Sequence, residues 1–296
     1  MFKILPVYAI WLAWFATSIN VVISKLAVPY VTSALFLFWT CLLAVLCFRI
    51  YFGKSGEWDK LFRKDVWPKA LGMGTFGTAL PMTIFMVALN YTTPVNAAIA
   101  NQFEIIYSLI LSAIILKEHP SLKQIAGSIL ILLGVGLIIL EGGTSLQAKG
   151  DLLVISCLWM YQVSHIFAKK LPTDLEPQTI AAARALYALP ALGLLCIVLS
   201  IIQGPLQFNA KAPTLWLVLG ASALINYFLG NCYWYQAIRH MDLSKATAII
   251  LSYPVMTYIL SVLFGQDRIT VYKITGMILA VGGAYIVTLL AKGAKK

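Results

Sequence analysis

Long apolar runs, separated by short polar or Pro/Gly turns, follow one another along the chain. Most are close to the ~20 residues that a helix needs to cross a bilayer, and runs this long span lipid as helices. The pattern predicts an all-α membrane protein with ten transmembrane helices. The predicted spans are 5–26, 31–50, 68–90, 94–116, 121–140, 151–170, 177–202, 213–238, 243–264 and 270–291.

The composition supports this class of protein. Hydrophobic residues make up 60% of the chain and charged residues only 11%, whereas about a quarter of a soluble chain is charged. Lys3 precedes the first apolar run, but this run is long enough to span, so we interpret it as a retained helix and not as a signal peptide. The five cysteines lie inside apolar runs without a CxxC pair, which indicates buried free thiols. We expect no metal and no cofactor.

The net charge of +11 would suit a nucleic-acid partner in a soluble protein, but here topology explains it better. With the N-terminus inside, sixteen Lys and Arg residues lie on the cytoplasmic side, five lie outside, and Arg184 lies within a span. Cytoplasmic loops favour basic residues. The sequence therefore predicts a multi-pass inner (plasma) membrane protein with both termini in the cytoplasm and no nucleic-acid partner.

The two halves of the chain repeat one another at a nearly constant offset. Trp14 and Lys25 recur as Trp159 and Lys170, 145 residues later, and from the third span onward the offset is 149. At this second offset the matched pairs are Ala88 and Ala237, Ala97 and Ala246, Glu118 and Asp267, Gly127 and Gly276, and Gly134 and Gly283. A unit of five spans must insert its second copy upside down, which is the plan of many secondary transporters. We expect two inverted five-helix repeats, 1–145 and 146–296.

The same residues carry a resemblance to a known family. In the first copy they are Trp14, Lys25, Ala97–Ala98, Leu116–Glu118, Gln124–Gly127 and Leu132–Gly134; in the second they are Ala246, Tyr253–Pro254, Phe264–Asp267, Lys273–Gly276 and Gly282–Gly283. This pattern is similar to the EamA branch of the drug/metabolite transporter superfamily. The resemblance implies ten helices in two inverted repeats around a central cavity. It also implies that the first, third, fourth, sixth, eighth and ninth spans line the cavity, and that the fifth and tenth support it.

Two positions depart from that family. Relatives often carry an arginine in the second span, where this chain has Trp39, and the matching arginine stands in the other copy as Arg184. The fourth span has Glu104 where its repeat mate has Tyr253. The substrate chemistry of relatives therefore does not transfer directly to this chain.

Glu104 is the foremost candidate for chemistry, because it lies near the middle of a predicted span. An ionised acid at that depth costs on the order of 3 kcal/mol, so it normally faces a wet cavity or the interior of a bundle. Asn101 and Ser108 share its helical face. Glu104 could couple transport to protons or bind a substrate amine. The alternative is a structural carboxylate, paired with Arg184 or hydrogen-bonded to a Tyr or Asn side chain.

Polar residues in the first and sixth spans form a second group of candidates. At the offset of 145, Thr17 corresponds to Gln162 and Asn20 to His165, so these side chains should lie symmetrically about the cavity. His165 could also take part in proton coupling, or it could be a neutral packing residue. Arg184 could bind a carboxylate bidentately, or its side chain could reach the membrane interface.

The remaining candidates are mostly aromatic or amide side chains. Asn226 and Tyr233 share a face of the eighth span, and we add Trp14, Trp39 and Tyr253 as candidates to line the cavity. Helix packing or an interfacial aromatic belt would explain the same residues. Pro254 removes a backbone hydrogen bond from the ninth span, so we predict a kink there that takes part in gating.

These observations predict a secondary active transporter, most simply an exporter of a small organic metabolite such as an amino acid. It would work by alternating access, and proton coupling is an option. A passive facilitator or channel is the main alternative. An intramembrane enzyme is another, but the chain lacks HExxH and GxSxG, and no P-loop indicates ATP as the energy source. The expected partners are the substrate and the bilayer, and a homodimer is left open.

Overall fold

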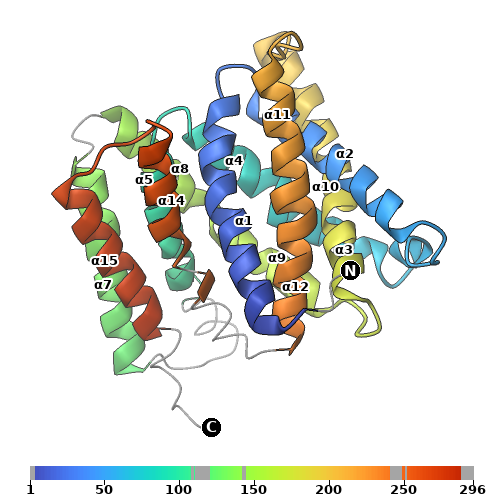
Figure 1. Cartoon of the computed structure of the whole chain (residues 1–296), viewed down its shortest axis with the longest axis horizontal. Coiled ribbons are helices and arrows are strands. Elements are labelled where there is room, and N and C mark those ends of the chain that lie inside the picture. The colour runs from blue at the N-terminus through green and yellow to red at the C-terminus, as the bar shows by residue number, and fades with distance from the viewer. Residues whose placement is uncertain are drawn as a thin grey trace.

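The computed structural model describes residues 4–107, 110, 121–141, 145–240, 249, 250 and 252–287. Within these ranges the chain is helical, and the only β pairing is an isolated bridge between Val31 and Phe208. The helices run side by side as a bundle, with neighbouring helices pointing up and down (Figure 1). The all-α prediction is confirmed.

The first half of the chain holds the following elements. They are α1 (Pro6–Ala27), α2 (Ser33–Phe52), the 3₁₀-helix η1 (Asp59–Phe62), α3 (Trp67–Gly74), the π-helix η2 (Thr75–Ala79), α4 (Leu80–Ala88), α5 (Pro94–Ala100), the 3₁₀-helix η3 (Asn101–Phe103) and α7 (Leu122–Glu141). Pro6 and Pro94 occupy the first turns of α1 and α5, where proline loses no helical hydrogen bond.

The second half follows the same order. Its elements are α8 (Ser145–Cys157), α9 (Trp159–Lys169), α10 (Pro177–Gln203), α11 (Pro213–Ala221), the π-helix η4 (Ser222–Gly230), α12 (Asn231–His240), α14 (Tyr253–Leu263) and α15 (Val271–Tyr285). Prolines again begin α10 and α11.

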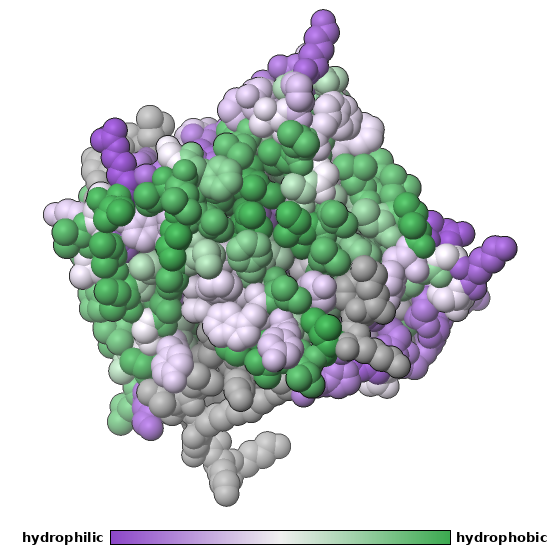
Figure 2. Space-filling model, viewed as in Figure 1, coloured by the Kyte–Doolittle hydropathy of each residue, from purple (hydrophilic) through white to green (hydrophobic). Residues whose placement is uncertain are grey.

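Six helical stretches are long and apolar enough to cross a membrane, counting only residues that the structure describes. They are Pro6–Ala27, Ser33–Phe52, Trp67–Ala88, Gln147–Ala168, Pro177–Gln203 and Pro213–Ala237. Three shorter apolar helices, Leu122–Ile138, Tyr253–Leu263 and Val271–Tyr285, fall at the predicted fifth, ninth and tenth spans. Green apolar side chains cover the middle of the face in Figure 2, and several hydrophilic ones lie toward its margins, as expected of a surface that meets lipid.

The irregular turns of the bundle recur at the offset of 149. Adding 149 to the limits of the π-helix Thr75–Ala79 gives Leu224 and Phe228, which lie inside the second π-helix. Adding 149 to the 3₁₀-helix Asn101–Phe103 gives 250–252, and Ser252 is a turn residue directly before α14. The third and eighth spans are thus distorted at equivalent places, and so are the fourth and ninth.

The fifth and tenth spans begin with related caps. The Ser121 hydroxyl accepts a hydrogen bond from the amide of Gln124 (3.3 Å), and the Gln124 side chain accepts one from the amide of Ser121 (2.7 Å). This is a capping box. At the offset of 149, Thr270 caps α15 by accepting from the amide of Lys273 (3.3 Å). The repeat seen in the sequence is therefore a repeat of local structure.

Glycines bring α7 and α15 into backbone contact. A Cβ atom at Gly134 would lie 2.5 Å from the Gly276 carbonyl oxygen, and one at Gly127 would lie 2.7 Å from the Gly283 carbonyl oxygen. No real side chain fits at such distances, so the four glycines are required for the two helices to pack. This explains why they recur seven residues apart in both copies, and Figure 1 shows the two helices side by side.

We expect Gly134→Ala to destabilise the protein by about 1–3 kcal/mol, because the added methyl group must push the α15 backbone away. Gly136 provides a matched control on the same helix, since a Cβ there would meet nothing within 4 Å. Gly136→Ala should be neutral or slightly stabilising. The thermal unfolding midpoint of the purified protein in detergent measures both effects, and equal midpoints for the two variants would contradict the packing argument.

Candidate functional site

Glu104 lies where the broken fourth span meets the second half of the chain. It follows the 3₁₀-helix η3 directly, and its Oε1 accepts a hydrogen bond from Nε2 of Gln162 on α9 (3.2 Å). Tyr161, Cys157 and Tyr253 are near enough to interact with it electrostatically. The structure thus brings two predicted site residues, one from each half, into direct contact.

Tyr253 begins α14, at the position that matches Glu104. Its side chain is buried, and its hydroxyl donates to the carbonyl of Ala98 on α5 (3.3 Å). The Ser18 hydroxyl donates to the Tyr253 carbonyl (3.4 Å), and the Thr257 hydroxyl donates to the Ser18 carbonyl (3.3 Å). These bonds tie α1 and α5 of the first half to α14 of the second.

Pro254 occupies the first turn of α14, directly after the turn at Ser252. A proline there fits the beginning of a helix better than a bend inside one. The ninth span is therefore interrupted where the sequence predicted a kink. The role of this interruption in gating stays a prediction.

The predicted residues of the first and eighth spans lie along the contact between α1 and η4. The Ser222 hydroxyl donates to Oδ1 of Asn20 (2.6 Å), which joins the two elements by side chains. Thr17 and Asn226 are half-buried on the same two elements. Tyr233 is half-buried on α12 and packs against a small cluster of Ala9, Ile10 and Ala237.

Arg184 donates hydrogen bonds to the distorted part of the third span. Its Nε donates to the Thr78 hydroxyl (3.0 Å), its Nη2 donates to the Gly77 carbonyl, and Tyr235 is a further partner. A π-helix leaves carbonyl groups poorly satisfied, and the guanidinium supplies a donor there. The sequence left open a carboxylate partner or a position at the interface, whereas these contacts are with groups of the bundle itself.

The two predicted tryptophans lie in different surroundings. The buried Trp14 Nε1 has no acceptor among the described residues, and the ring meets Trp11 edge-on at 5.3 Å. Trp39 packs against Phe208 (6.0 Å) and against the exposed Trp216 (6.4 Å). Trp39 is therefore part of an aromatic cluster near the surface.

Three predicted residues remain to be placed. Asn101 is half-buried in η3. His165 lies on α9, three residues after Gln162, and its side chain falls outside what the structure describes. Ser108 lies outside the described residues altogether. Their roles, and those of the other predicted site residues, stay predictions.

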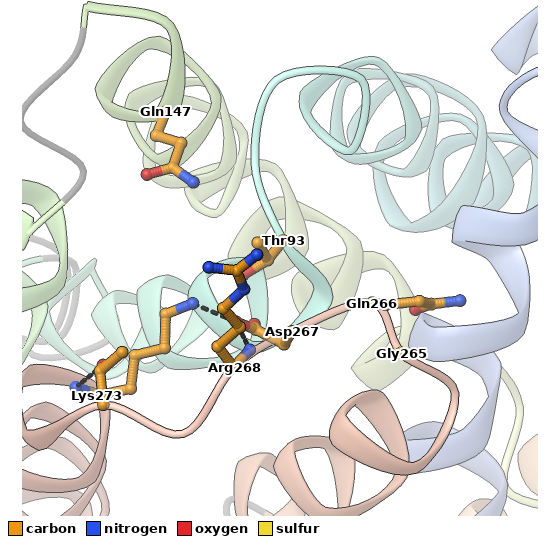
Figure 3. Close-up of a pocket in the computed structure, with 8 residues that line it drawn as sticks. Thr93, Gln147, Gly265, Gln266, Asp267, Arg268 and Lys273 are labelled. Atoms are coloured by element: carbon orange, nitrogen blue, oxygen red, sulfur yellow. Dashed lines mark hydrogen bonds and ion pairs between the residues drawn. The ribbon is translucent and has the colours of Figure 1, made fainter.

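A polar pocket of about 320 Å³ opens at one end of the bundle, which we call the Lys25 end. Here Lys25 Nζ donates to the carbonyls of Leu89 and Thr92. The pocket is lined by Thr93, Gln147, Gly265, Gln266, Asp267, Arg268, Thr270 and Lys273 (Figure 3). At its base Lys273 and Asp267 form an ion pair, with side chains only 8% and 2% exposed. The first and second halves both contribute to this pocket.

Sequence reasoning missed one buried acid beside the pocket. Asp151 is completely buried on α8, where its two carboxylate oxygens accept hydrogen bonds from Thr92 and Asn96. It stands at the first position of the predicted sixth span, and it was not among the predicted site residues. The only signal in the sequence was that this acid follows Lys149-Gly150 and directly precedes an apolar run.

Comparison with known proteins agrees with this architecture. A 26% identical relative, "Uncharacterized transporter YyaM" of Bacillus subtilis (strain 168), matches over 81% of this chain and 78% of its own length. An "Uncharacterized transporter" of Archaeoglobus fulgidus is 24% identical over 80% of this chain and 81% of its own. One solved crystal structure covers 97% of this chain and 98% of its own with a TM-score of 0.66, and at 19% identity it shows the fold alone.

The family profile described as "EamA-like transporter family" matches twice, over residues 4–140 and 148–289. The two matches cover most of the chain, and each corresponds to one of the two copies described above. The relatives are likewise described as transporters, so the chain is a transport protein and not an enzyme. The protein belongs to the EamA-like transporter family of the drug/metabolite transporter superfamily, with two EamA repeats in one membrane-embedded chain.

Proposed function

We propose that this transporter is a proton-coupled secondary active exporter of a small organic metabolite, an amino acid or a related amphipathic solute. The observation that carries the proposal is the hydrogen bond between Glu104 and Gln162 (3.2 Å), which joins the two repeats beside the interrupted spans. An ionisable carboxyl group inside a membrane is costly, and the few that occur usually belong to a pathway for ions, protons or substrate.

Coupling follows from the chemistry of that contact. Ionised Glu104 accepts the hydrogen bond from Gln162, whereas a protonated carboxyl group can donate one itself and carries no charge. The free energy of the contact between the halves therefore depends on the proton. A group that both repeats touch can bias one arrangement of the halves over another, as alternating access requires.

The predicted site residues that the structure describes suit a small amphipathic solute. Amide, hydroxyl and aromatic groups of Asn20, Asn226 and Tyr253 come from elements next to the interrupted spans. Ligand sites are mostly apolar, with a few polar groups that fix orientation. Arg184 and Asn101 would add polar contacts to such a site.

Orientation is also part of the proposal. Basic residues gather at the end of the bundle opposite to the Lys25 end, where Arg63 pairs with Asp174 (2.5 Å) and Arg239 with Glu176 (3.3 Å). The positive-inside tendency supports a cytoplasmic location for that end and for both termini, in an inner (plasma) membrane. With five spans in each unit, the two repeats would then be inverted relative to each other. A homodimer is not required, because one chain supplies both halves.

Counterflow in proteoliposomes tests whether the protein is a carrier. Vesicles loaded with an unlabelled mixture of the common amino acids are diluted into a trace of the radiolabelled mixture. A carrier takes up label several-fold faster when its inside is loaded, because the reorienting site returns with substrate. Equal uptake by empty and loaded vesicles would favour the passive facilitator. Uptake no faster than by protein-free vesicles, while a nucleoside mixture is exchanged, would overturn the amino-acid assignment.

A further inference from the structure

Asp151 is a buried carboxylate through which the second half of the chain contacts the first. It belongs to α8 of the second half, and none of its surface is exposed. The Thr92 hydroxyl donates to Oδ1 (2.5 Å), and Nδ2 of Asn96 donates to Oδ2 (3.4 Å). Both donors come from the first half, next to and within α5.

The pocket at the Lys25 end lies directly beside this carboxyl group. Gln147 lines the pocket and stands one helical turn before Asp151 on the same face of α8. Thr93 lines it too and follows Thr92 in the chain. Lys273, another lining residue, interacts electrostatically with Asp151. Three residues that line the pocket are thus neighbours of the acid, either in the chain or through an electrostatic interaction.

The cations nearby are already engaged with other groups. Lys273 is paired with Asp267, Lys25 donates to the carbonyls of Leu89 and Thr92, and Lys149 lies over the Tyr91 ring at 4.5 Å. No ion pair with Asp151 occurs among the described residues. Of the described groups, three act directly on Asp151: Thr92 and Asn96 donate hydrogen bonds to it, and Lys273 interacts with it electrostatically. Asp267 reaches it only through its ion pair with Lys273, and Gln147 lies one turn away on its own helix.

Glu104 lies further along the same contact. It stands eight residues after Asn96, about two helical turns deeper, and α8 packs against both α5 and η3. Neither acid has an acidic repeat mate, because Pro6 occupies the position that matches Asp151 and Tyr253 the position that matches Glu104. A fully buried acid, Asp151, and a half-buried one, Glu104, thus follow one interface between the halves, and Asp151 is the one nearer to the polar pocket.

We propose that Asp151 is a second proton-binding site, supplied with protons from the pocket at the Lys25 end and working in series with Glu104. This inference rests on the proton coupling proposed above and adds a residue and an entrance to it. A proton from pocket water adds to one carboxylate oxygen, which neutralises the charge that faces Lys273. The bonds from Thr92 and Asn96 weaken, because an ionised acceptor binds donors more strongly than a neutral one. The proton is then passed on to the Glu104 carboxylate, and Asp151 recovers its charge.

Infrared titration of the purified protein in lipid tests the site without any substrate. The carbonyl stretch of protonated carboxyl groups is followed against pH for the wild type and for Asp151→Asn. We expect the variant to lose one titrating component of this band, and an unchanged band over the whole pH range would overturn the proposal.

Thr92 provides a second, milder test if Asp151→Asn does not insert. Thr92→Val removes the donor to the ionised acid and keeps the shape, so the midpoint should rise by about one pH unit, a tenfold increase in proton affinity. Thr92→Ser retains the hydroxyl and should keep the wild-type midpoint. Identical midpoints for Thr92→Val and Thr92→Ser would contradict a titrating Asp151.

A transport measurement separates this inference from the proposed function. The pH profile of amino-acid counterflow should move to higher pH in Thr92→Val and stay in place in Thr92→Ser. A profile that does not move in Thr92→Val would overturn the inference and leave the carrier proposal intact. Absence of counterflow in the wild type would overturn the carrier proposal, whereas the infrared result would still decide whether Asp151 binds a proton.

Discussion

Replacing Glu104 with glutamine is expected to abolish accumulation of amino acids driven by a pH gradient. Glutamine keeps the size of the side chain and an oxygen that can accept from Gln162 (3.2 Å in the native contact), but it cannot take up a proton. The free energy of the contact between residues 104 and 162 then no longer depends on pH. We expect accumulation to fall to the level of protein-free vesicles, with uptake measured after an imposed pH gradient.

Glu176→Gln provides the matched control for this prediction. Its carboxylate is exposed and pairs with Arg239 at the edge of the bundle (3.3 Å), so the same chemical change should leave accumulation unchanged. Size-exclusion profiles of both variants establish that they remain folded. Gradient-driven accumulation and a pH profile in Glu104→Gln that equal those of the wild type would show that Glu104 is only structural.

Much of the architecture could be predicted from the sequence because it depends on local patterns. Apolar run length predicts helices that cross a bilayer. The glycines that recur seven residues apart in both copies are visible in the sequence as well, and they reflect the contact between α7 and α15. By contrast, the sequences of the two π-helices look like ordinary apolar α-helix. These are Thr75–Ala79 and Ser222–Gly230. A π-turn depends on partners far away in the chain, such as Arg184 at the Gly77 carbonyl, and no pattern within the span reveals them.

The candidate site, like the fold, could be predicted from the sequence in part. The carboxylate of Glu104 stands out in the sequence because it lies in the middle of an apolar run. The offset between the copies pairs Gln162 with Thr17, which makes Gln162 a candidate to line the same cavity. The contact between Glu104 and Gln162 nevertheless depends on the relative height of two helices, which the offset does not give. Asp151 was missed because a residue at the end of a run can be buried or exposed, and only Thr92 and Asn96 from the other half decide which.

Glu104 and Asp151 differ between the two halves of the chain, whereas the helices around them repeat. Matching irregular turns in the third and eighth spans, and in the fourth and ninth, give both halves places where the helices can rearrange. Glu104 and Asp151 have no acidic mates, so protonation of either one would act on one interface between the halves and not equally on both. A difference of this kind would let a proton favour one arrangement of two otherwise equivalent halves.

Removing the amine of the buried ion pair below the pocket should strongly destabilise the protein. In Lys273→Met, Asp267 keeps a side chain that is 2% exposed and loses its cationic partner. Breaking a buried pair from one side typically costs about 3–5 kcal/mol, because an uncompensated charge stays buried. The Arg268 amide, which donates to Asp267 Oδ1 (2.8 Å), compensates only in part. We expect a clear fall in the thermal unfolding midpoint in detergent.

A double variant tests whether the buried charge is the cause. Adding Asp267→Leu to Lys273→Met removes the orphaned carboxylate, and replacing both charges by apolar side chains is often neutral or even stabilising. The double variant should therefore recover most of the lost midpoint. Lys211→Met removes an exposed lysine and should change the midpoint little. A double variant that is less stable than Lys273→Met alone would show that the ion pair contributes net stability at this end of the bundle. The explanation by an unpaired, buried Asp267 carboxylate would then be wrong.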